Sequence, residues 1–282
     1  MNIEFTSMAL CLADSLIEMV GFDPIDQIKR YLKWYREGYN SSTGECFDIG
    51  NQTRSSLEYF ESSLESTSLE YTSLESTSLE YINKENIYKI IKERGTSGIS
   101  LGNGSFSLGN GSLMRLSPIP MYYYPDRDRV KEHAALSSLT THPGRECLEA
   151  CSLYSSLIID AFEGKRKREI MNTLKREIRS SESLGGLGIE ESILSGVGCI
   201  PSGYAIDSLK CSIRCFIEST SFEESILLAA NLGGDSDTIW RAICGQLAGA
   251  YYGMSGIPSG WMDILYHRDH IIDRADRLYD KR

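Results

Sequence analysis

Apolar residues recur at intervals of three and four along most of the chain, and this spacing constrains the fold more than any other feature of the sequence. Between residues 6 and 20 the repeating positions are Met8, Leu12, Leu16 and Met19, which lie on one face of a helix. The same spacing predicts further helices over residues 24–37, 145–162, 166–180, 204–218 and 222–231. Alternating strand patterns are almost absent, so we expect an all-α fold, a compact helical bundle.

Length and charge favour an ordinary acidic domain. The chain has 282 residues, 41% of them hydrophobic, which suffices for a sizeable core, and we expect a single domain over residues 1–282. The net charge is −10, and the richest basic run, residues 165–168, is flanked by Glu163 and Glu169. This pattern is typical of a solvated helix face and not of a nucleic-acid site.

The sequence also argues against a membrane or secretory location. No stretch approaches the roughly 20 apolar residues that span a bilayer. The N-terminus has no basic region and carries Asp14 within its apolar part, unlike a signal peptide. The eight scattered cysteines include no CxxC pair and are expected to be buried free thiols. We therefore expect a monomeric, cytoplasmic protein that binds neither nucleic acid nor membrane.

Two duplications interrupt the helical pattern. SSLESTSLEY and TSLESTSLEY follow one another over residues 62–81, and their five-residue period fits neither a helix nor a strand. SLGNGS occurs over residues 100–105 and again over residues 107–112. We interpret residues 56–100 as a low-complexity insert within the domain, forming an expanded surface loop that is disordered or weakly helical. The serine- and glycine-rich stretch at residues 38–54 is expected to be an ordered loop.

The GGDSDT segment places Asp235 and Asp237 two residues apart, directly before Thr238 and a small-residue helix. Two such carboxylates repel one another unless a cation lies between them. With the threonine hydroxyl they offer the hard oxygen ligands that Mg²⁺, Mn²⁺ or Ca²⁺ accept. Helix capping is the alternative, and it accounts for one aspartate better than for the pair.

Three further segments carry candidate functional residues. GNGSLMRLSPIP, residues 109–120, supplies bare backbone N–H groups that suit a phosphate, or else forms an ordinary glycine turn. Its Arg115 either neutralises a phosphate or forms structural hydrogen bonds. FDIGNQT contains Asp48, which we expect to be partly buried. Asp48 can act as a base, orient a sugar hydroxyl, or form an Asx turn. THPG places His142 before a helix, where packing alone also explains a histidine.

Taken together and in this order, the segments resemble the ADP-ribosylglycohydrolase family, which includes the dinitrogenase reductase-activating glycohydrolases. The matching stretches cover most of the chain outside the duplicated insert. They are TSMALCLADSLIE, WYREGYNSSTGECFDIGNQT, GNGSLMRLSPIPMYY, SSLTTHP and GGDSDTIWRAICGQLAGAYYGMSGIPSGW.

The resemblance implies an all-α domain with a binuclear Mg²⁺ or Mn²⁺ site that hydrolyses the bond between ADP-ribose and a protein side chain, often arginine, or a related conjugate. It implies that Asp235, Asp237 and Thr238 are metal ligands, with Asp237 also catalytic. Asp48 falls beside the substrate ribose as the second catalytic residue. The substrate-binding positions that it implies are Gly109, Asn110, Gly111, Ser112, Met114 and His142.

The sequence departs from the family pattern at its N-terminus. Family members carry a Gly-Asp-x-x-Gly-type segment on a first helix, and then Thr-Asp-Asp-Thr just before the residues that correspond to Ser7-Met8. Here that run is Ile3-Glu4-Phe5-Thr6, and the earlier element would precede Met1, which predicts an N-terminally truncated domain. Glu4 can substitute for one metal ligand, whereas Phe5 cannot ligate a metal.

Two functional hypotheses follow from this departure. In the first, the chain is a hydrolase that works with one metal ion, or with Glu4 as a substitute ligand. In the second, it is a degenerate member that binds ADP-ribose without turnover and holds one metal ion or none, because an incomplete ligand set removes the two-metal clamp. A purely structural helical protein would leave the aspartate pair and the glycine-rich loops unexplained.

Overall fold

The computed structural model describes residues 4–70, 108–199, 202–233 and 236–280, and describes only the backbone of residues 4, 63–70 and 236–240. Within these ranges the chain consists of helices and connecting loops, with one isolated bridge between Gly109 and Tyr204. The all-α prediction is therefore confirmed.

The helices follow the expected apolar periodicity closely. The predicted helices at residues 24–37 and 145–162 have the bounds of α2 and α8, and the others differ by one or two residues at an end. In chain order they are α1 (Glu4–Glu18), α2 (Pro24–Glu37), α3 (Asn51–Glu70), α5 (Gly111–Met114), α6 (Pro118–Tyr123), α7 (Arg127–Leu139), α8 (Arg145–Phe162), α9 (Lys167–Ser180), α10 (Ile189–Ser195), α11 (Ala205–Glu218), α12 (Phe222–Ala230), α13 (Ser236–Tyr252), the 3₁₀ helix η1 (Met254–Gly256), α14 (Ser259–Asp263) and α15 (Arg268–Asp280).

Local chemistry sets the ends of α2. The Asp23 carboxylate accepts the backbone N–H of Ile25 at 2.9 Å, and Pro24 fills the first helical position, where no N–H is needed. Gly38 ends the helix in the left-handed conformation, with φ of 70°. A Cβ at Gly38 would lie 2.2 Å from the Gly44 carbonyl oxygen, so the loop that follows α2 also requires glycine here.

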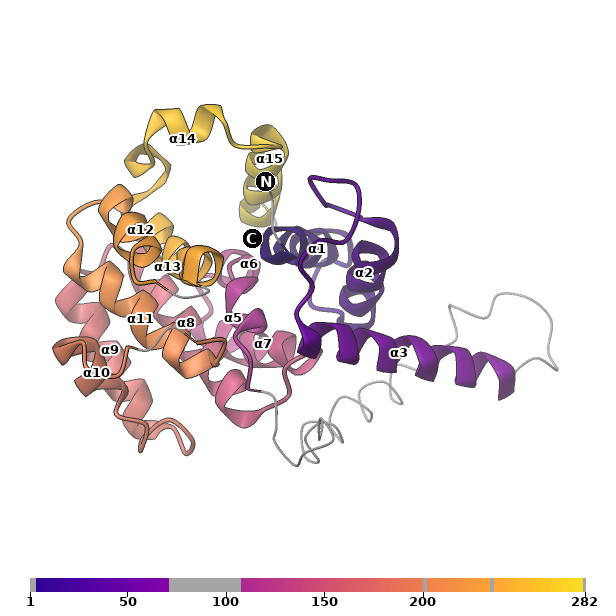
Figure 1. Cartoon of the computed structure of the whole chain (residues 1–282), viewed down its shortest axis with the longest axis horizontal. Helices are drawn as coiled ribbons and strands as arrows, with labels where there is room; N and C mark the ends of the chain where they lie inside the picture. Colours follow the sequence, from indigo (N-terminus) through magenta and orange to yellow (C-terminus); the bar gives the residue numbers. More distant parts are fainter. Residues whose placement is uncertain (1–3, 71–107, 200–201, 234–235, 281–282) are drawn as a thin grey trace.

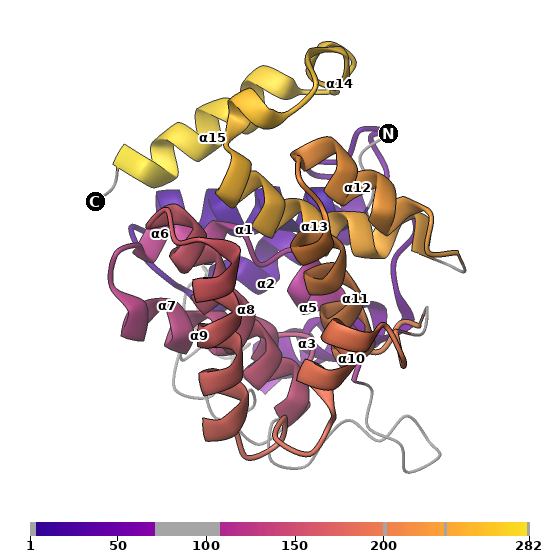
Figure 2. The ribbon, with the colours of Figure 1, turned by 90° about the vertical axis from the view of Figure 1, so that its left-hand side faces the viewer.

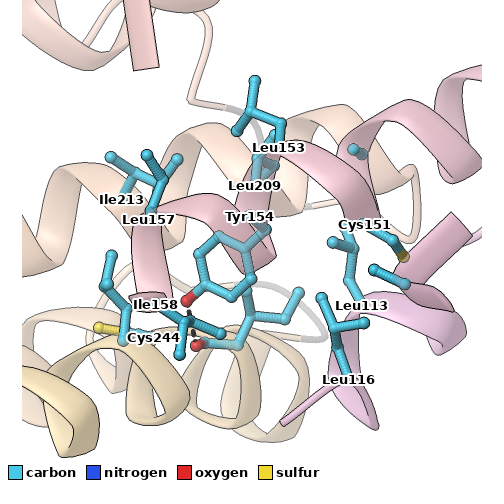
Figure 3. Packing of buried hydrophobic residues seen from close by; sticks show 14 of the residues in the cluster. Leu113, Leu116, Cys151, Leu153, Tyr154, Leu157, Ile158, Leu209, Ile213 and Cys244 are labelled. Atoms are coloured by element: carbon cyan, nitrogen blue, oxygen red, sulfur yellow. Dashed lines mark hydrogen bonds between the residues drawn. The ribbon is translucent and has the colours of Figure 1, made fainter. Parts of the chain in front are cut away.

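The helices form two groups with three further helices between them. Figure 1 shows α1–α3 on one side and α8–α13 on the other, with α5–α7 between them, and in Figure 2 α1–α3 lie behind α8–α13. The largest hydrophobic cluster is built around α8, whose Leu157 and Ile158 are fully buried against residues of α5, α11 and α13 (Figure 3). The Tyr154 hydroxyl donates to the Ile243 carbonyl, which ties α8 to α13 within this apolar cluster.

The last helix is fixed to the first by a buried ion pair. Arg274 of α15 donates from Nε to Asp14 Oδ1 at 2.7 Å, and Tyr39 and Asn40 each donate to Asp14 Oδ2 at 2.9 Å. Burial raises the pKa of Asp14, but these hydrogen bonds outweigh it and hold the pKa below its ordinary value. The carboxylate within the apolar pattern of α1 therefore has a structural partner.

The region around the repeats differs from the expected loop. α3 begins at Asn51, so residues 51–54 are helical, and the Arg54 N–H donates to the Gly50 carbonyl at 2.9 Å. The helix continues to Glu70, through the first part of the duplication, and Leu57 and Phe60 are buried on it. Residues 71–107 lie outside the described residues, so the extent of the insert stays a prediction.

The cysteines match the prediction of free thiols. All eight are free, and those other than Cys46 and Cys199 are buried. Burial raises the pKa of Cys151 to about 11, which keeps this thiol protonated. Among the described helices, none is long and apolar enough to cross a membrane.

Candidate functional site

The glycine-rich GNGS segment is held by a later part of the chain. The Asn110 N–H donates to the Gly203 carbonyl at 3.1 Å, and the Asn110 side-chain amide donates to Ser208 Oγ on α11 at 2.8 Å. Asn110 and Gly111 are buried. The Asn110 N–H, one of the backbone donors that the sequence suggested were bare, is thus already paired. The segment is fixed in place before any ligand binds.

Two other predicted residues of this loop, Ser112 and Met114, face the protein interior. Ser112 Oγ accepts a hydrogen bond from Ser138 Oγ at 2.8 Å, and the Cys151 thiol lies 3.5 Å from the same oxygen. Met114 is 5% exposed and belongs to the main hydrophobic cluster. These two side chains contribute to the support behind the loop in this structure.

His142 lies directly against the start of α5. A Cβ added to Gly111 would lie 2.8 Å from His142 Cε1 and 3.0 Å from His142 Nε2, and 3.6 Å from Thr53 Oγ1. Such distances exclude any side chain at Gly111 unless the ring moves. The structure therefore brings together the GNGS and THPG segments, which are far apart in the sequence.

The His142 ring is neutral at physiological pH. Burial, assisted by the positive charge of Arg115, lowers the pKa of His142 to about 3, because both disfavour the imidazolium form. Thr141 Oγ1 lies 2.8 Å from His142 Nδ1. A neutral imidazole in this position offers hydrogen bonds to a ligand but no positive charge.

Two residues that the sequence analysis missed hold the His142 loop. Gln52 Nε2 and Ser56 Oγ both donate to the Thr141 carbonyl, at 2.8 and 2.9 Å. The His142 N–H donates to the Ser138 carbonyl at 2.7 Å. Gln52 and Ser56 are four residues apart, on one face of the first turns of α3. Two polar residues at helical spacing directly after FDIG are the signal that could have identified them.

Asp48 lies three residues before α3 and is exposed, not partly buried. Its φ is 59°, in the left-handed region that aspartate tolerates better than most residues. α3, which begins just after it, carries Gln52, bonded to the His142 loop, and Thr53, beside Gly111. Asp48 is therefore a solvent-accessible carboxylate that lies close in sequence to Gln52 and Thr53.

Arg115 has a structural position. It is fully buried and donates from one guanidinium nitrogen to Thr141 Oγ1 at 2.6 Å and to Thr140 Oγ1 at 3.3 Å. Its guanidinium carbon lies 4.7 Å from the centre of the Tyr31 ring. Of the two roles open from the sequence, the structure supports hydrogen bonding within the protein, because these contacts occupy the guanidinium group behind the site.

α13 carries two further predicted residues and is joined to α5. Gln246 Nε2 donates to the carbonyls of Leu113 and Met114, at 2.9 and 3.0 Å.

Asp237 and Thr238 fall in the first turn of α13, whereas Asp235 lies outside the described residues. The small residues of α13 allow close packing, since a Cβ on Gly245 would lie 3.5 Å from Ile226 of α12.

The start of α1 does not fit the second half of a binuclear metal centre. Glu4 is the first residue of α1, and its side chain is outside the described atoms. Phe5 is 9% exposed and packs in the main hydrophobic cluster. At the position where the resemblance implies a metal-ligating carboxylate, the chain therefore has a core side chain. The donor set of Asp235, Asp237 and Thr238, in contrast, has the hard oxygen chemistry that a divalent cation prefers.

Comparisons with known proteins place these features in a family context. A family model described as ADP-ribosylglycohydrolase matches residues 4–282. The chain is 32% identical to an ADP-ribosylarginine hydrolase Tri1 of Pseudomonas putida, with 98% of this chain and 65% of that protein covered. It is 29% identical to the protein of the same name from Serratia proteamaculans, with 97% and 66% covered. The chain thus spans just under two thirds of the length of both relatives.

A solved structure also resembles the whole chain. It is described as an ADP-ribosylglycohydrolase-related protein complex and aligns with a TM-score of 0.72 at 31% sequence identity. The alignment covers 100% of this chain and 82% of that structure. The helical arrangement and the sequence match thus extend over the same residues.

Proposed function

This chain belongs to the ADP-ribosylglycohydrolase family, and we propose that it removes ADP-ribose from a modified protein side chain, with ADP-ribosyl-arginine as the substrate class. One observation carries the proposal: the segments expected to line an ADP-ribose pocket meet at Gly111, within contact distance of His142 and Thr53. The names of the Pseudomonas and Serratia relatives support arginine as the acceptor.

In this proposal the pocket wall, formed by Gly111, His142 and Thr53, binds and orients the ADP-ribosyl group. Neutral His142 supplies hydrogen bonding without charge, and Gly111 leaves room for the His142 ring beside the loop backbone. The exposed Asp48 acts on the ribose side, where its carboxylate orients a ribose hydroxyl or takes the proton of the attacking water. Hydrolysis then breaks the bond between the ribose carbon and the arginine nitrogen, which leaves protonated.

Asp235, Asp237 and Thr238 are the residues that would hold Mg²⁺ or Mn²⁺. When bound, the cation supplies Lewis-acid polarisation of substrate oxygens. Because Phe5 lies in the core, we propose one cation at this end of α13 and not the binuclear arrangement of the family. Gln246 fixes α13 against α5, so the helix that carries Asp237 and Thr238 is attached to the GNGS loop.

The burial of Phe5 also favours a second candidate function, binding of ADP-ribose without turnover. A pocket wall assembled from buried, paired polar groups needs no metal ion to keep its shape. Loss of half of the metal ligands would then remove catalysis while leaving recognition intact.

The deciding experiment measures release of ADP-ribose from ADP-ribosyl-arginine protein, with and without Mg²⁺ or Mn²⁺. We expect metal-dependent release that Asp237→Ala abolishes. Asp269→Ala, which removes a side chain that is 85% exposed on α15, is the matched control and should leave release unchanged. Calorimetry with the metal alone should show affinity lost in Asp237→Ala. Unchanged metal affinity in that variant would contradict the metal assignment.

Absence of release from the wild-type protein, together with retained ADP-ribose binding, would support the second candidate. Absence of both would contradict the two functions alike.

A further inference from the structure

A buried chain of three polar side chains leads from the interior to the pocket wall. Arg115 donates to Thr141 Oγ1 at 2.6 Å, and Thr141 Oγ1 lies 2.8 Å from His142 Nδ1. All three residues are at most 2% exposed. At the far side of the ring, His142 Nε2 lies against the backbone of Gly111.

The direction of these hydrogen bonds follows from the chemistry of each group. A guanidinium has only donors, so the Thr141 oxygen must accept from Arg115. The proton of the Thr141 hydroxyl is then directed to another acceptor, and His142 Nδ1 is at hydrogen-bond distance. We propose that Arg115, acting through the Thr141 hydroxyl, fixes His142 as the tautomer protonated on Nε2, so that the ring presents a hydrogen-bond donor beside Gly111.

The two alternative protonation states are less favourable. A proton on Nδ1 would point at an oxygen that already accepts from Arg115, and the buried Thr141 hydroxyl would lose its acceptor among the described residues, at a cost of about 1–3 kcal/mol. A doubly protonated ring is opposed by burial and by the charge of Arg115, which together lower the pKa of His142 to about 3. The tautomer is assigned from the bonding pattern rather than observed.

The backbone around the ring supports a fixed orientation. The Thr141 carbonyl accepts from Gln52 and Ser56, and the His142 N–H donates to the Ser138 carbonyl at 2.7 Å. Neither the loop nor the ring can rotate freely, so Nε2 keeps its place beside Gly111. Arg115 and Thr141 are therefore positioning residues that act through His142.

This inference deepens the proposed function, on which the identity of the ligand rests. An Nε2–H donor selects an acceptor oxygen, such as a phosphate or ribose oxygen of the ADP-ribosyl group, and not a donor or a cation. Because the ring is neutral, it recognises this oxygen by hydrogen bonding at any pH from weakly acidic to alkaline. Arg115 acts on the ligand through the polarised Thr141–His142 pair.

The test is the ¹⁵N spectrum of the imidazole rings in the free, full-length protein. The sequence contains four histidines, and the His142 signals are assigned by their loss in His142→Gln. Long-range ¹H–¹⁵N correlations distinguish a protonated ring nitrogen from a bare one. We expect Nε2 protonated and Nδ1 bare, unchanged from pH 5 to pH 8. A proton on Nδ1, or rapid averaging between the nitrogens, would overturn the assignment.

Thr141→Val and Thr141→Ser test the role of the hydroxyl. The valine variant keeps the branched shape but lacks the hydroxyl, so we expect its two ring nitrogens to average towards each other. The serine variant retains the hydroxyl and should show the wild-type pattern. A wild-type pattern in Thr141→Val would overturn the relay from Arg115. The wild-type spectrum decides the tautomer even where the valine variant does not fold.

A titration with ADP-ribose tests the ligand part of the inference separately from the tautomer of the free protein. We expect ADP-ribose to shift the Nε2–H signal of His142 and to leave Nδ1 bare. A protonated Nε2 that does not respond to ADP-ribose would overturn the ligand part of the inference. Absence of any ADP-ribose binding by calorimetry would contradict the proposed function itself, which the spectrum of the free protein does not depend on.

Discussion

The two sides of the candidate site are built from different kinds of contact. Around His142, the buried polar side chains from Gln52 on α3 to Arg115 after α5 form hydrogen bonds to one another or to the backbone. At the start of α1, the position where the family places a metal-binding carboxylate holds Phe5, packed in the hydrophobic cluster. The proposed binding side is thus polar, whereas the position of the implied metal ligand at the start of α1 is apolar.

In the proposed function, this difference separates recognition from catalysis within one fold. The pocket wall depends on hydrogen bonds that need no cation. The metal half depends on carboxylates, and replacing one by an apolar side chain leaves the helix stable while changing its chemistry. The experiments below act on one side or the other, in order of expected effect.

The largest effect is expected from restoring a carboxylate on the metal side. Phe5→Asp removes a buried aromatic ring and places a charge in its cluster, so we expect a loss of about 3–5 kcal/mol in the free energy of unfolding. Phe5→Leu is the control and should lose less than about 1.5 kcal/mol. Urea unfolding without added metal measures both.

Repeating the Phe5→Asp measurement with Mg²⁺ or Mn²⁺ sharpens the result. If the added carboxylate completes a second metal position, the cation will recover part of the lost stability in this variant more than in the wild type. A Phe5→Asp protein as stable as the wild type without metal would contradict the placement of Phe5 in the core.

A smaller effect is expected from Gln52 and Ser56, which hold the His142 loop. Gln52 and Ser56 donate to the same oxygen, the Thr141 carbonyl, so either one alone still satisfies it. We expect Gln52→Leu and Ser56→Ala each to lose about 1 kcal/mol or less, and the double variant to lose about 2–3 kcal/mol, more than the sum. Strictly additive losses in urea unfolding would show that the two donors act independently.

The third effect is a pH dependence that comes from His142. In the unfolded chain this histidine has an ordinary pKa of 6.5, whereas in the folded protein the pKa is about 3. As the pH falls below 6.5, the unfolded state therefore binds a proton that the native state does not, and stability declines until the pH approaches 3.

In His142→Gln this contribution is absent. The free energy of unfolding of the variant should therefore fall less steeply as the pH is lowered, and the slopes of the two proteins should differ by about 1.4 kcal/mol per pH unit within that window. The free energies of unfolding of the two proteins, measured between pH 7 and pH 4.5, give the comparison. Parallel curves would contradict a buried neutral histidine.

The sequence predicted the helices well because their apolar faces bury against a common core, as α8 shows along its whole length. It also identified Gly111 and His142 from their motifs. It could not show that a glycine at residue 111 is required by the ring of His142, because that contact joins segments far apart in the chain.

Other features depended on tertiary pairing and were missed. Gln52 and Ser56 fell in a stretch expected to be mostly loop, and their role depends on a carbonyl in another segment. Arg115 had two roles open, and only the position of Thr141 distinguishes them. Asp48 was expected to be partly buried, whereas the left-handed turn before α3 exposes it.

The most direct test of the central claim, that a preformed pocket wall at Gly111 and His142 binds ADP-ribose, is calorimetry of ADP-ribose with the wild type, Gly111→Ala and Gly260→Ala. An added Cβ at Gly111 would contact the buried His142 ring at 2.8 Å, whereas a Cβ at Gly260 would have no neighbour within 4 Å. We predict binding by the wild type and by Gly260→Ala, and at least about tenfold weaker binding by Gly111→Ala, a difference of about 1.4 kcal/mol. Equal affinity in all three proteins would contradict the account.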